Sequence, residues 1–242
     1  MCTVTYIPKE KNEFILTSNR DESPLRSPKN ITRIEERGET LMFPRDKTAG
    51  GTWIAVSGKD RVVCLLNGAF DYHRHDPPYR MSRGLMVLNY FNFPSAHAFF
   101  DAFPFLGMEP FTMIIAERDQ LFDFRWDGIQ RHIKQLDTKH AHIWSSATLY
   151  PSAIIRKREQ WFAEWMLNRV DFSNEAILDF HHHAGDGDSS NDLIMNRGGI
   201  VQTVSITSII KKEDQIDMDY HDLINDETKQ QEVKIQVLKQ ML

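Results

Sequence analysis

Residues 1–22 read MCTVTYIPKEKNEFILTSNRDE and hold the strongest fold signal in this chain. Residues 3–7 alternate in polarity and are rich in β-branched and aromatic side chains, which favours a β-strand. The polar KEKN stretch at 9–12 predicts a turn, and EFILTS at 13–18 predicts a second strand. We therefore expect an antiparallel hairpin at the N-terminus. Residues 19–28, which follow its second strand, are predicted to form a polar, Pro-containing loop.

The composition is that of a globular protein with a sizeable core. Of the 242 residues, 41% are hydrophobic and 26% are charged, and the net charge is −5. Interspersed charges with a negative balance argue against a nucleic-acid-binding protein, for which a basic patch is typical. Since no linker rich in Gly, Ser or Pro divides the chain, we expect one domain over residues 1–242.

Cysteine usage and hydropathy indicate the cellular setting. Cys2 and Cys64 are too few for a disulfide scaffold, and Cys64 lies in an apolar, strand-like run that predicts a buried, inert thiol. The N-terminus lacks the basic start and following apolar stretch that indicate a signal peptide. No apolar run approaches the ~20 residues that cross a bilayer. We expect a reduced, cytoplasmic protein without a transmembrane segment.

The rest of the chain alternates between groups of strands and groups of helices. Strand-like stretches separated by turn residues occupy 50–57, 61–70, 111–117, 120–128, 129–136, 140–147, 200–212 and 215–223. Helical spacing and N-caps predict helices over 82–91, 95–103, 150–167 and 173–183, with a weakly helical tail over 225–242. Strands grouped in hairpins indicate an α+β fold of antiparallel sheets with segregated helices. Two sheets stacked between helical layers fit the length, although periodicity leaves a simpler two-layer arrangement open.

Cys2 follows the initiator methionine, a position poorly suited to core packing. Aminopeptidases that remove Met1 require a small second side chain, and their action would leave a thiol and a free α-amine on one residue. The reference pKa is about 7.7–8.0 for the α-amine and about 8.5 for the thiol, so a base and a nucleophile would be assembled together. The alternative is that Cys2 is simply a small residue on an N-terminal strand.

Four consecutive polar residues end the second predicted strand: Asn19, Arg20, Asp21 and Glu22. In a hairpin, this end of the strand lies near Cys2. There, Asp21 could accept hydrogen bonds from an α-ammonium group, and Arg20 would favour a thiolate. The alternative is an ordinary strand-ending turn with a surface ion pair, which leaves the position of Cys2 unexplained.

Two further stretches place glycines at strand ends. Gly50 and Gly51 precede a strand and permit a positive φ or a close backbone approach, at a bulge, a ligand-facing turn or a plain turn. Asn67 stands before a glycine at the end of another strand. Its amide, or the backbone N–H groups beside it, could donate to a developing oxyanion, but Asn-Gly is also the strongest short hairpin signal.

Taken in order, these motifs resemble the NRDE (transport and Golgi organisation protein 2-like) family over most of the chain. The resemblance rests on MCTVTY, TSNRDE, GGTWIAVS, LLNGAF and WSSATLYPSAIIRKR followed by VSIT. More distantly, the chain resembles the N-terminal-nucleophile hydrolases of the penicillin acylase and bile-salt hydrolase type. The resemblance implies a four-layer αββα sandwich of two antiparallel sheets, with Cys2 heading the first strand.

The resemblance also implies roles for the polar residues near the N-terminus. Cys2 matches the nucleophile of the hydrolases. Their arginine and aspartate lie three residues apart, a spacing that falls on Asn19 and Glu22 in this chain. Since the same residue types stand between these two positions, we assign the pair to Arg20 and Asp21.

Further roles fall later in the chain. Asn67 resembles the oxyanion asparagine of the hydrolases, whereas Ser146 and Val204 stand where a second asparagine and a late arginine are expected. The substrate-binding surface is expected to include Asn19, Glu22, Gly51, Thr52, Trp53 and Ser146.

Other motifs give weaker signals. HHH at 181–183 is typical of a helix end, where partly charged histidines suit the helix dipole, and its spacing matches no zinc motif. DGDSSND at 186–192 is no EF-hand calcium loop, because Asn191 and Arg197 occupy the places of its glycine and glutamate. The YHRHD stretch at 72–76 is either an active-site rim or a plain solvated loop.

Two functions follow from this sequence. In the first, Cys2 attacks the carbonyl of a small-molecule amide or acyl substrate, as a hydrolase or acyltransferase acting on a C–N bond without metal or cofactor. Asp21 would orient the α-amine, Arg20 would lower the thiol pKa and Asn67 would stabilise the oxyanion. The alternative is a non-enzymatic carrier of haem or an acyl ligand in the same fold, which the missing asparagine and arginine favour. Without a C-x-x-C-H motif, haem would bind non-covalently. The oligomeric state stays open.

Overall fold

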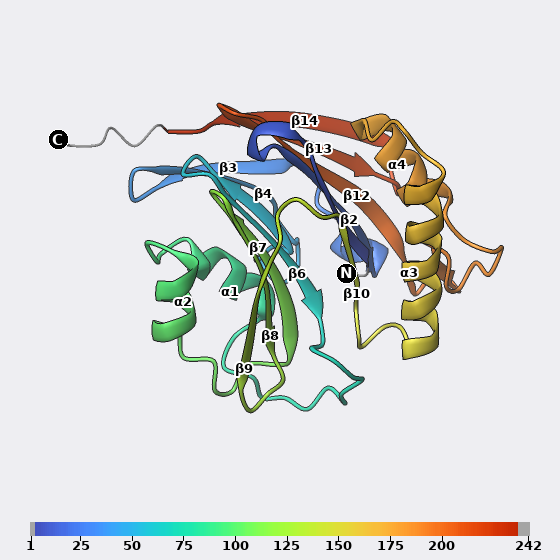
Figure 1. Ribbon diagram of the computed structural model, residues 1–242. Helices are drawn as coiled ribbons and strands as arrows, with labels where there is room; N and C mark the ends of the chain where they lie inside the picture. The colour runs from blue at the N-terminus through green and yellow to red at the C-terminus, as the bar shows by residue number, and fades with distance from the viewer. Residues whose placement is uncertain (1–2, 237–242) are drawn as a thin grey trace.

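A computed structural model of the chain describes residues 3–236, whose strands form two antiparallel sheets of seven strands each (Figure 1). The first sheet holds, from edge to edge, β10 (His142–Ser145), β1 (Thr3–Pro8), β2 (Phe14–Glu22), β12 (Val201–Lys211), β13 (Gln215–Asp222) and β14 (Glu227–Lys234). A short strand pairs with β12 beside this path, β11 (Asn196–Arg197). The second sheet holds, in sequence order, β3 (Ile31–Glu36), β4 (Glu39–Pro44), β5 (Ile54–Ser57), β6 (Arg61–Asn67), β7 (Phe111–Glu117), β8 (Gln120–Trp126) and β9 (Arg131–Leu136).

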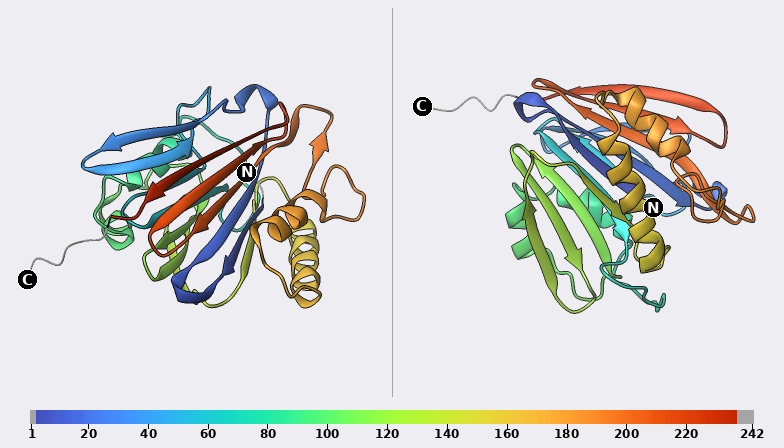
Figure 2. Two further views of the ribbon diagram at one scale, coloured as in Figure 1. Left: turned by 90° about the horizontal axis from the view of Figure 1, so that it is seen from above. Right: turned by 45° about the vertical axis from the view of Figure 1, so that its right-hand side comes forward.

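Helices cover the outer face of each sheet (Figures 1 and 2). The second sheet carries α1 (Arg83–Tyr90) and α2 (Ala96–Ala102), and the first carries α3 (Ser152–Leu167) and α4 (Asn174–His183). The predicted N-caps form, since the Ser95 and Ser173 side chains accept hydrogen bonds from the first turns of α2 and α4. The layer order is helix, sheet, sheet, helix, which confirms the predicted four-layer αββα sandwich.

Apolar side chains fill all three interfaces between these layers. Val4 and Leu16 of the first sheet pack against Ile54 of the second sheet in the central layer. An aromatic cluster that includes Phe99 seals α1 and α2 onto the second sheet, and a smaller cluster around Phe180 seals α3 and α4 onto the first. Because both sheets are covered on both faces, most of their strands are buried on both sides. Within the described residues, no helix is long and apolar enough to span a membrane.

The N-terminal hairpin forms as predicted, but its second strand is longer. β2 runs through the NRDE segment to Glu22, where the sequence predicts a loop. Its polar residues stay in the strand because β12 pairs with all four of them, and β1 pairs with the first, Asn19, on the other edge, which satisfies backbone hydrogen bonds there. The strand predicted over 50–57 begins later, at Ile54.

Two other segments differ from the sequence predictions. The prediction of a weakly helical tail is wrong for its described part, because β14 pairs along its whole length with β13 and buries Val233 between the sheets. Tertiary pairing here overrides a weak helical propensity. Residues 31–44, for which no helix or strand is predicted, form the β3–β4 hairpin around Gly38, whose φ is +70°.

Candidate active site

The N-terminal hairpin brings the polar end of β2 beside the start of β1. Thr3, the first described residue, pairs with Asn19 across the two strands. On the other edge of β2, Asp21 pairs with Thr203 of β12. Cys2, the predicted nucleophile, precedes Thr3 and lies outside the described residues. The register therefore puts the NRDE segment next to the residue that follows Cys2.

Strand alternation divides the NRDE segment between two faces. Arg20 points between the sheets, where its guanidinium contacts Asp46 in the loop that follows β4. Asn19 points to the opposite face and contacts His181 of α4. Asp21 shares the face of Asn19, because residues two apart on a strand lie on one side. The two residues assigned as the polar partners of Cys2 thus lie on opposite faces of one strand.

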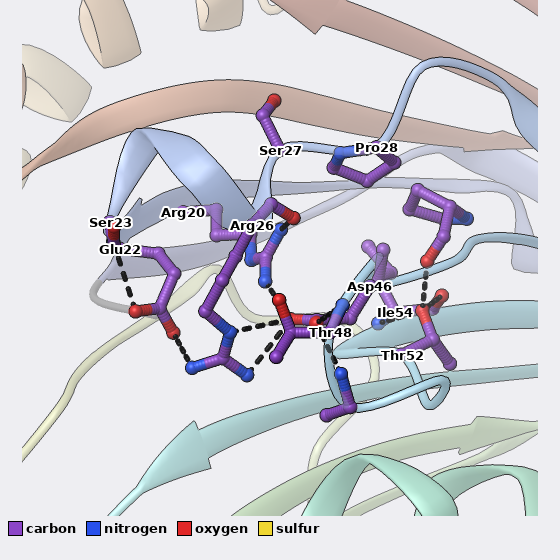
Figure 3. A network of polar contacts seen from close by, with 12 residues as sticks. Arg20, Glu22, Ser23, Arg26, Ser27, Pro28, Asp46, Thr48, Thr52 and Ile54 are labelled. Carbon is purple, nitrogen blue, oxygen red and sulfur yellow. Dashed lines mark hydrogen bonds and ion pairs between the residues drawn. The ribbon is translucent and has the colours of Figure 1, made fainter.

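The face that carries Arg20 holds a network of paired charges (Figure 3). The Arg20 guanidinium donates to an Asp46 carboxylate oxygen and to the carbonyl oxygen of Arg26, and it lies 4.0 Å above the centre of the Trp53 ring. Arg26 lies between two carboxylates, 2.9 Å from Asp46 and 2.5 Å from Glu22. Each positive charge on this face therefore has a carboxylate within contact distance.

The protonation states of this network follow from burial and pairing. Burial alone would raise the pKa of Asp46, but the backbone hydrogen bond from Ala49 and the charges of Arg20 and Arg26 lower it below its usual value. Burial lowers the pKa of Arg20, an effect that the Asp46 charge opposes. An arginine pKa starts so high that Arg20 stays charged at neutral pH. The pair is therefore ionic at neutral pH.

A pocket of about 250 Å³ lies between the sheets where β2 and β6 end. Of the predicted site residues, those that line it are Arg20, Glu22, Gly51, Thr52, Trp53 and Asn67. A Cβ at Gly51 would lie 2.3 Å from the carbonyl carbon of Gly84, so only glycine permits this approach of the loop to α1. Asn19 and Ser146 are buried and do not line this pocket.

The opposite wall of the pocket is built around Glu109. Its carboxylate lies 3.1 Å from the Arg83 guanidinium and 3.1 Å from the His75 ring, and a second ring, that of His73, lies 3.3 Å away. His75, Arg83 and Glu109 all line the pocket. The YHRHD stretch therefore forms part of the pocket rim, which was one of its two predicted roles.

Asn67 lies at the end of β6, with its side chain half-buried at the pocket. Its backbone carbonyl accepts a hydrogen bond of 2.9 Å from the Ser146 hydroxyl. Gly68 follows with φ +80°, and a Cβ there would lie 2.9 Å from Thr148, so the end of β6 packs directly on the loop after β10. Val204, in the place of the expected arginine, is fully buried where the β2–β12 register shifts.

Asp21 is buried on the helix-facing side of β2. The Tyr150 hydroxyl donates to one carboxylate oxygen at 2.7 Å, and the Thr203 hydroxyl donates to the other at 2.5 Å. Hydrogen bonds to an ionised acceptor are short and strong, so these hydroxyls hold the carboxylate in one orientation. Asp21 is thereby fixed beside the start of β1.

Asn19 and His181 form a second buried contact on this face. The Asn19 amide donates to the carbonyl oxygens of His181 and Leu193, and its side-chain oxygen contacts the His181 ring. Burial, helped by the charges of His182 and Arg158, lowers the pKa of His181 to about 3. The prediction of a partly charged helix-end histidine is therefore wrong for His181, which is neutral and buried. Within residues 3–236, no three His, Cys, Asp or Glu side chains are grouped to hold a metal ion.

Most of the charged residues that pair with the predicted site residues or build the pocket wall are not predicted from the sequence. Asp46 follows β4 in a stretch to which no element was assigned, and Glu109 precedes β7 with no local motif. Arg83 and Arg158 belong to helices that were predicted, but neither residue was singled out. The sequence does not indicate that a charged residue in a helix is buried, because its burial depends on which distant elements pack against that helix.

The chain is similar in sequence to one protein family and in structure to several solved proteins. A family model described as Transport and Golgi organisation 2 matches residues 1–232. A conjugated bile acid hydrolase from Clostridium perfringens, with alanine in place of a cysteine, is similar at TM-score 0.55 and 10% identity, over 99% of this chain and 98% of that chain. A second variant of that enzyme, with leucine in place of an arginine, gives TM-score 0.53 and 10% identity over 98% of each chain. A Caenorhabditis elegans orthologue of N-acylethanolamine-hydrolyzing acid amidase gives 0.48 and 12% identity, over 86% and 92%. Curated protein sequences give no significant match.

At 10% identity, the likeness to the bile acid hydrolase shows the fold alone. The layer order and this likeness together define the class: the chain has the αββα fold of the N-terminal-nucleophile hydrolases. The family match then covers nearly all of the described residues. The chain belongs to the Transport and Golgi organisation 2 family, as its NRDE motif and the motifs around it indicate.

Proposed function

We propose that the chain is an N-terminal-cysteine hydrolase or acyltransferase, which acts on an amide (C–N) bond after Met1 is removed. The observation that carries this proposal is the pairing of Thr3 with Asn19, because it sets the residue after Cys2 beside Arg20 and the pocket that Arg20 lines. The shared αββα fold supports it. One of the bile acid hydrolase structures carries alanine in place of a cysteine, the residue type proposed here as nucleophile.

In this mechanism, the Cys2 thiolate forms a C–S bond to the amide carbonyl carbon, and the carbonyl electron pair moves onto oxygen. Asn67 donates to this oxyanion from the pocket wall. The α-ammonium group of Cys2, oriented by Asp21, then gives its proton to the leaving nitrogen as the C–N bond breaks. Water or an amine then attacks the thioester carbonyl and passes a proton to the neutral α-amine, and the C–S bond breaks to release the acid or the new amide and restore the thiolate. Arg20 adds positive charge near the pocket, although Asp46 balances much of it.

The pocket supports a small and polar substrate. Its volume of about 250 Å³ is below the range of about 300–1,000 Å³ that is typical for drug-sized ligands. Its walls carry the ion pairs of Arg20 and Glu109, which favour a substrate with hydrogen-bonding groups over an apolar chain. We also propose that the protein works in the reducing cytoplasm, where an accessible Cys2 thiol would remain free.

The test combines a mass measurement with alkylation. Mass spectrometry of the purified protein should find Met1 absent, and iodoacetamide should label Cys2. Cys64 is a matched internal control, because full burial raises its pKa to about 12 and leaves it unreactive. Cys2→Ser and Cys2→Ala should both lose the label. Mature protein that keeps Met1, or label that survives in Cys2→Ala, would contradict the proposal.

A second proposal is a non-enzymatic carrier of a small acyl ligand. It is favoured by the buried, apolar Val204 and by the Ser146 hydroxyl, which donates to a backbone carbonyl and not to the pocket. Haem is the alternative ligand of such a carrier, and it would bind non-covalently. Titration with micromolar haemin is then expected to shift the Soret band, and His75→Ala at the pocket rim would test whether this pocket holds it. An unshifted band would contradict haem binding.

A further inference from the structure

Three buried residues carry a polar side-chain atom that has no hydrogen-bond partner among residues 3–236: Trp53 at Nε1, Ser205 at Oγ and Thr207 at Oγ1. Trp53 is 2% exposed, and Ser205 and Thr207 have no exposed surface, so bulk solvent does not reach them. A buried N–H or hydroxyl without any hydrogen bond is unfavourable, and folded proteins satisfy nearly all such groups with protein atoms or ordered water. The three atoms therefore point to a ligand that supplies their missing hydrogen bonds.

The two hydroxyls lie on the same face of β12. Ser205 and Thr207 are two residues apart, so both side chains point to one side of the strand. Thr207 pairs with Tyr220 of β13, and Ser205 pairs with Arg20 of β2. Directly paired residues share a face of the sheet, and both Tyr220 and Arg20 point between the two sheets. The hydroxyls of Ser205 and Thr207 therefore point into the central layer of the sandwich.

The Trp53 ring covers this stretch of β12 from the second sheet. Trp53 comes directly before β5, and the centre of its ring lies 4.0 Å from the Arg20 guanidinium and 6.5 Å from the centre of the Tyr220 ring. Because Arg20 and Tyr220 flank Ser205 and Thr207 on the neighbouring strands, an indole that reaches both lies over these two hydroxyls. One place between the sheets thus gathers an N–H donor and two hydroxyls, each of which can donate or accept.

The polar groups next to this place are occupied elsewhere. The Tyr220 hydroxyl lies 3.3 Å from the Ser27 hydroxyl and donates to a backbone carbonyl at 3.4 Å. Burial raises the pKa of Tyr220, and the nearby Ser27 and Ser205 hydroxyls oppose this effect, but Ser205 and Tyr220 do not meet hydrogen-bond geometry. Ser18, which pairs with Thr207, donates to the carbonyl oxygen of the next residue. None of these side chains therefore satisfies Ser205 or Thr207.

We propose that ordered water binds between the sheets at Trp53, Ser205 and Thr207. The ligand must be neutral, because the one charge beside the site, that of Arg20, is already paired with Asp46. It must both donate and accept, and buried water typically makes about three hydrogen bonds to polar groups of this kind. Side chains two residues apart on a strand are separated by about 6.6 Å, which is too far for a direct hydrogen bond but suits a bridge through water. Since Trp53 and Arg20 also line the pocket, this water site forms part of its back wall.

The direct test is a crystal structure of the wild-type protein at a resolution that shows ordered water. We expect electron density for water within hydrogen-bond distance of at least two of the three atoms. Magnetic relaxation dispersion of water nuclei gives an independent measurement in solution, because it counts waters that stay bound inside a protein. The wild type should hold more of these long-lived waters than Thr207→Val, which removes one hydroxyl from the site.

The sign of the stability change separates a hydrated site from a dry one. If water satisfies the Thr207 hydroxyl, Thr207→Val loses a hydrogen bond, and the equilibrium constant for unfolding in urea should rise about fivefold. If the hydroxyl is dry, its removal relieves an unsatisfied group, and the same constant should fall. Thr17→Val is the matched control, because Thr17 is equally buried but its hydroxyl is hydrogen-bonded to Ser208 at 2.9 Å. It should lose stability with no change in the number of long-lived waters.

Three results would overturn the inference. The first is a wild-type crystal structure that shows other buried waters but no density at the three atoms. The second is a Thr207→Val variant that is more stable than the wild type, and the third is density at this place for a co-purified molecule other than water. The wild-type measurements stand even if Thr207→Val fails to fold. No outcome depends on Cys2, so the proposed function is tested separately.

Discussion

The two faces of β2 treat charge in opposite ways. On the face between the sheets, Arg20 and Asp46 form a buried ion pair, and Arg26 is held between two carboxylates. On the helix-facing side, the Asp21 carboxylate accepts from two hydroxyls, and Arg158 is buried without an ion pair in the described part of the chain. Four consecutive residues thus serve two different electrostatic environments.

This difference changes the electric field on each side of β2. An ion pair has a weak electric field beyond its two partners. The pocket that Arg20 lines therefore carries balanced charge, because Asp46 offsets Arg20. The helix-facing side keeps its charges apart, with the Tyr150 ring between Arg158 and Asp21.

The largest effect on stability is expected where the paired face is broken. Arg20→Met leaves the Asp46 carboxylate buried with only the half-exposed Arg26 as a cationic partner. Removing one partner of a buried pair costs about 3–5 kcal/mol, and we expect the free energy of unfolding in urea to fall by about that amount.

The control for this prediction is the double change with Asp46→Asn. Removing both charges avoids the unpaired carboxylate, so the double variant should be less destabilised than the sum of the two single variants. A loss below about 1 kcal/mol in Arg20→Met would show that the pair is solvated and would remove the difference between the two faces.

The helix-facing side is expected to lose stability in mild acid. His181 has a pKa of about 3 in the folded protein, against 6.5 when unperturbed. The unfolded chain therefore binds a proton that the folded chain does not, and stability falls as the pH drops from 6.5 toward 3. At pH ~5 the loss is about 2 kcal/mol relative to neutral pH, measurable by urea unfolding at the two pH values.

His181→Gln isolates this contribution. Burial also lowers the pKa of His182 and His221, so some acid sensitivity of the same sign should remain in the variant. The difference in unfolding free energy between neutral and mildly acidic pH should nevertheless shrink by most of the amount expected for His181. An unchanged difference would mean that this histidine is already protonated in the folded protein.

The sequence predicts the parts of this fold that depend on neighbours in the chain. The N-terminal hairpin and the caps at Ser95 and Ser173 follow from local patterns. What it does not predict are pairings between distant segments. Arg20 and Asp46 are 26 residues apart, and Arg158 and Thr3 are 155 apart. No local pattern indicates that a helical arginine is buried against the first strand.

For the same reason, the sequence alone does not predict which side chains of the NRDE segment (Asn19–Glu22) point to which face of the sheet. Predicted as a loop, it would leave all four side chains free to gather around one point. Because β12 pairs with it along its length, it continues as a strand, and its alternation sends Asn19 and Asp21 to one face and Arg20 to the other. The assigned roles of Arg20 and Asp21 stay predictions, since Cys2 lies outside the described residues.

The smallest effect is expected at the exposed end of the paired face. Glu22→Gln removes the carboxylate that lies 2.5 Å from Arg26, but these side chains are 24% and 36% exposed and Arg26 keeps Asp46. Partly exposed ion pairs contribute about 0–1 kcal/mol, so the urea midpoint should change little and the change should shrink further in high salt. Because Glu22 and Arg20 lie on the same face, this variant separates burial from charge pairing as the cause of the Arg20 effect. If Glu22→Gln lowered the free energy of unfolding as much as Arg20→Met does, and high salt did not reduce this loss, the ion pairs of this face would act as one coupled network. Their contributions would then not depend on how exposed each pair is.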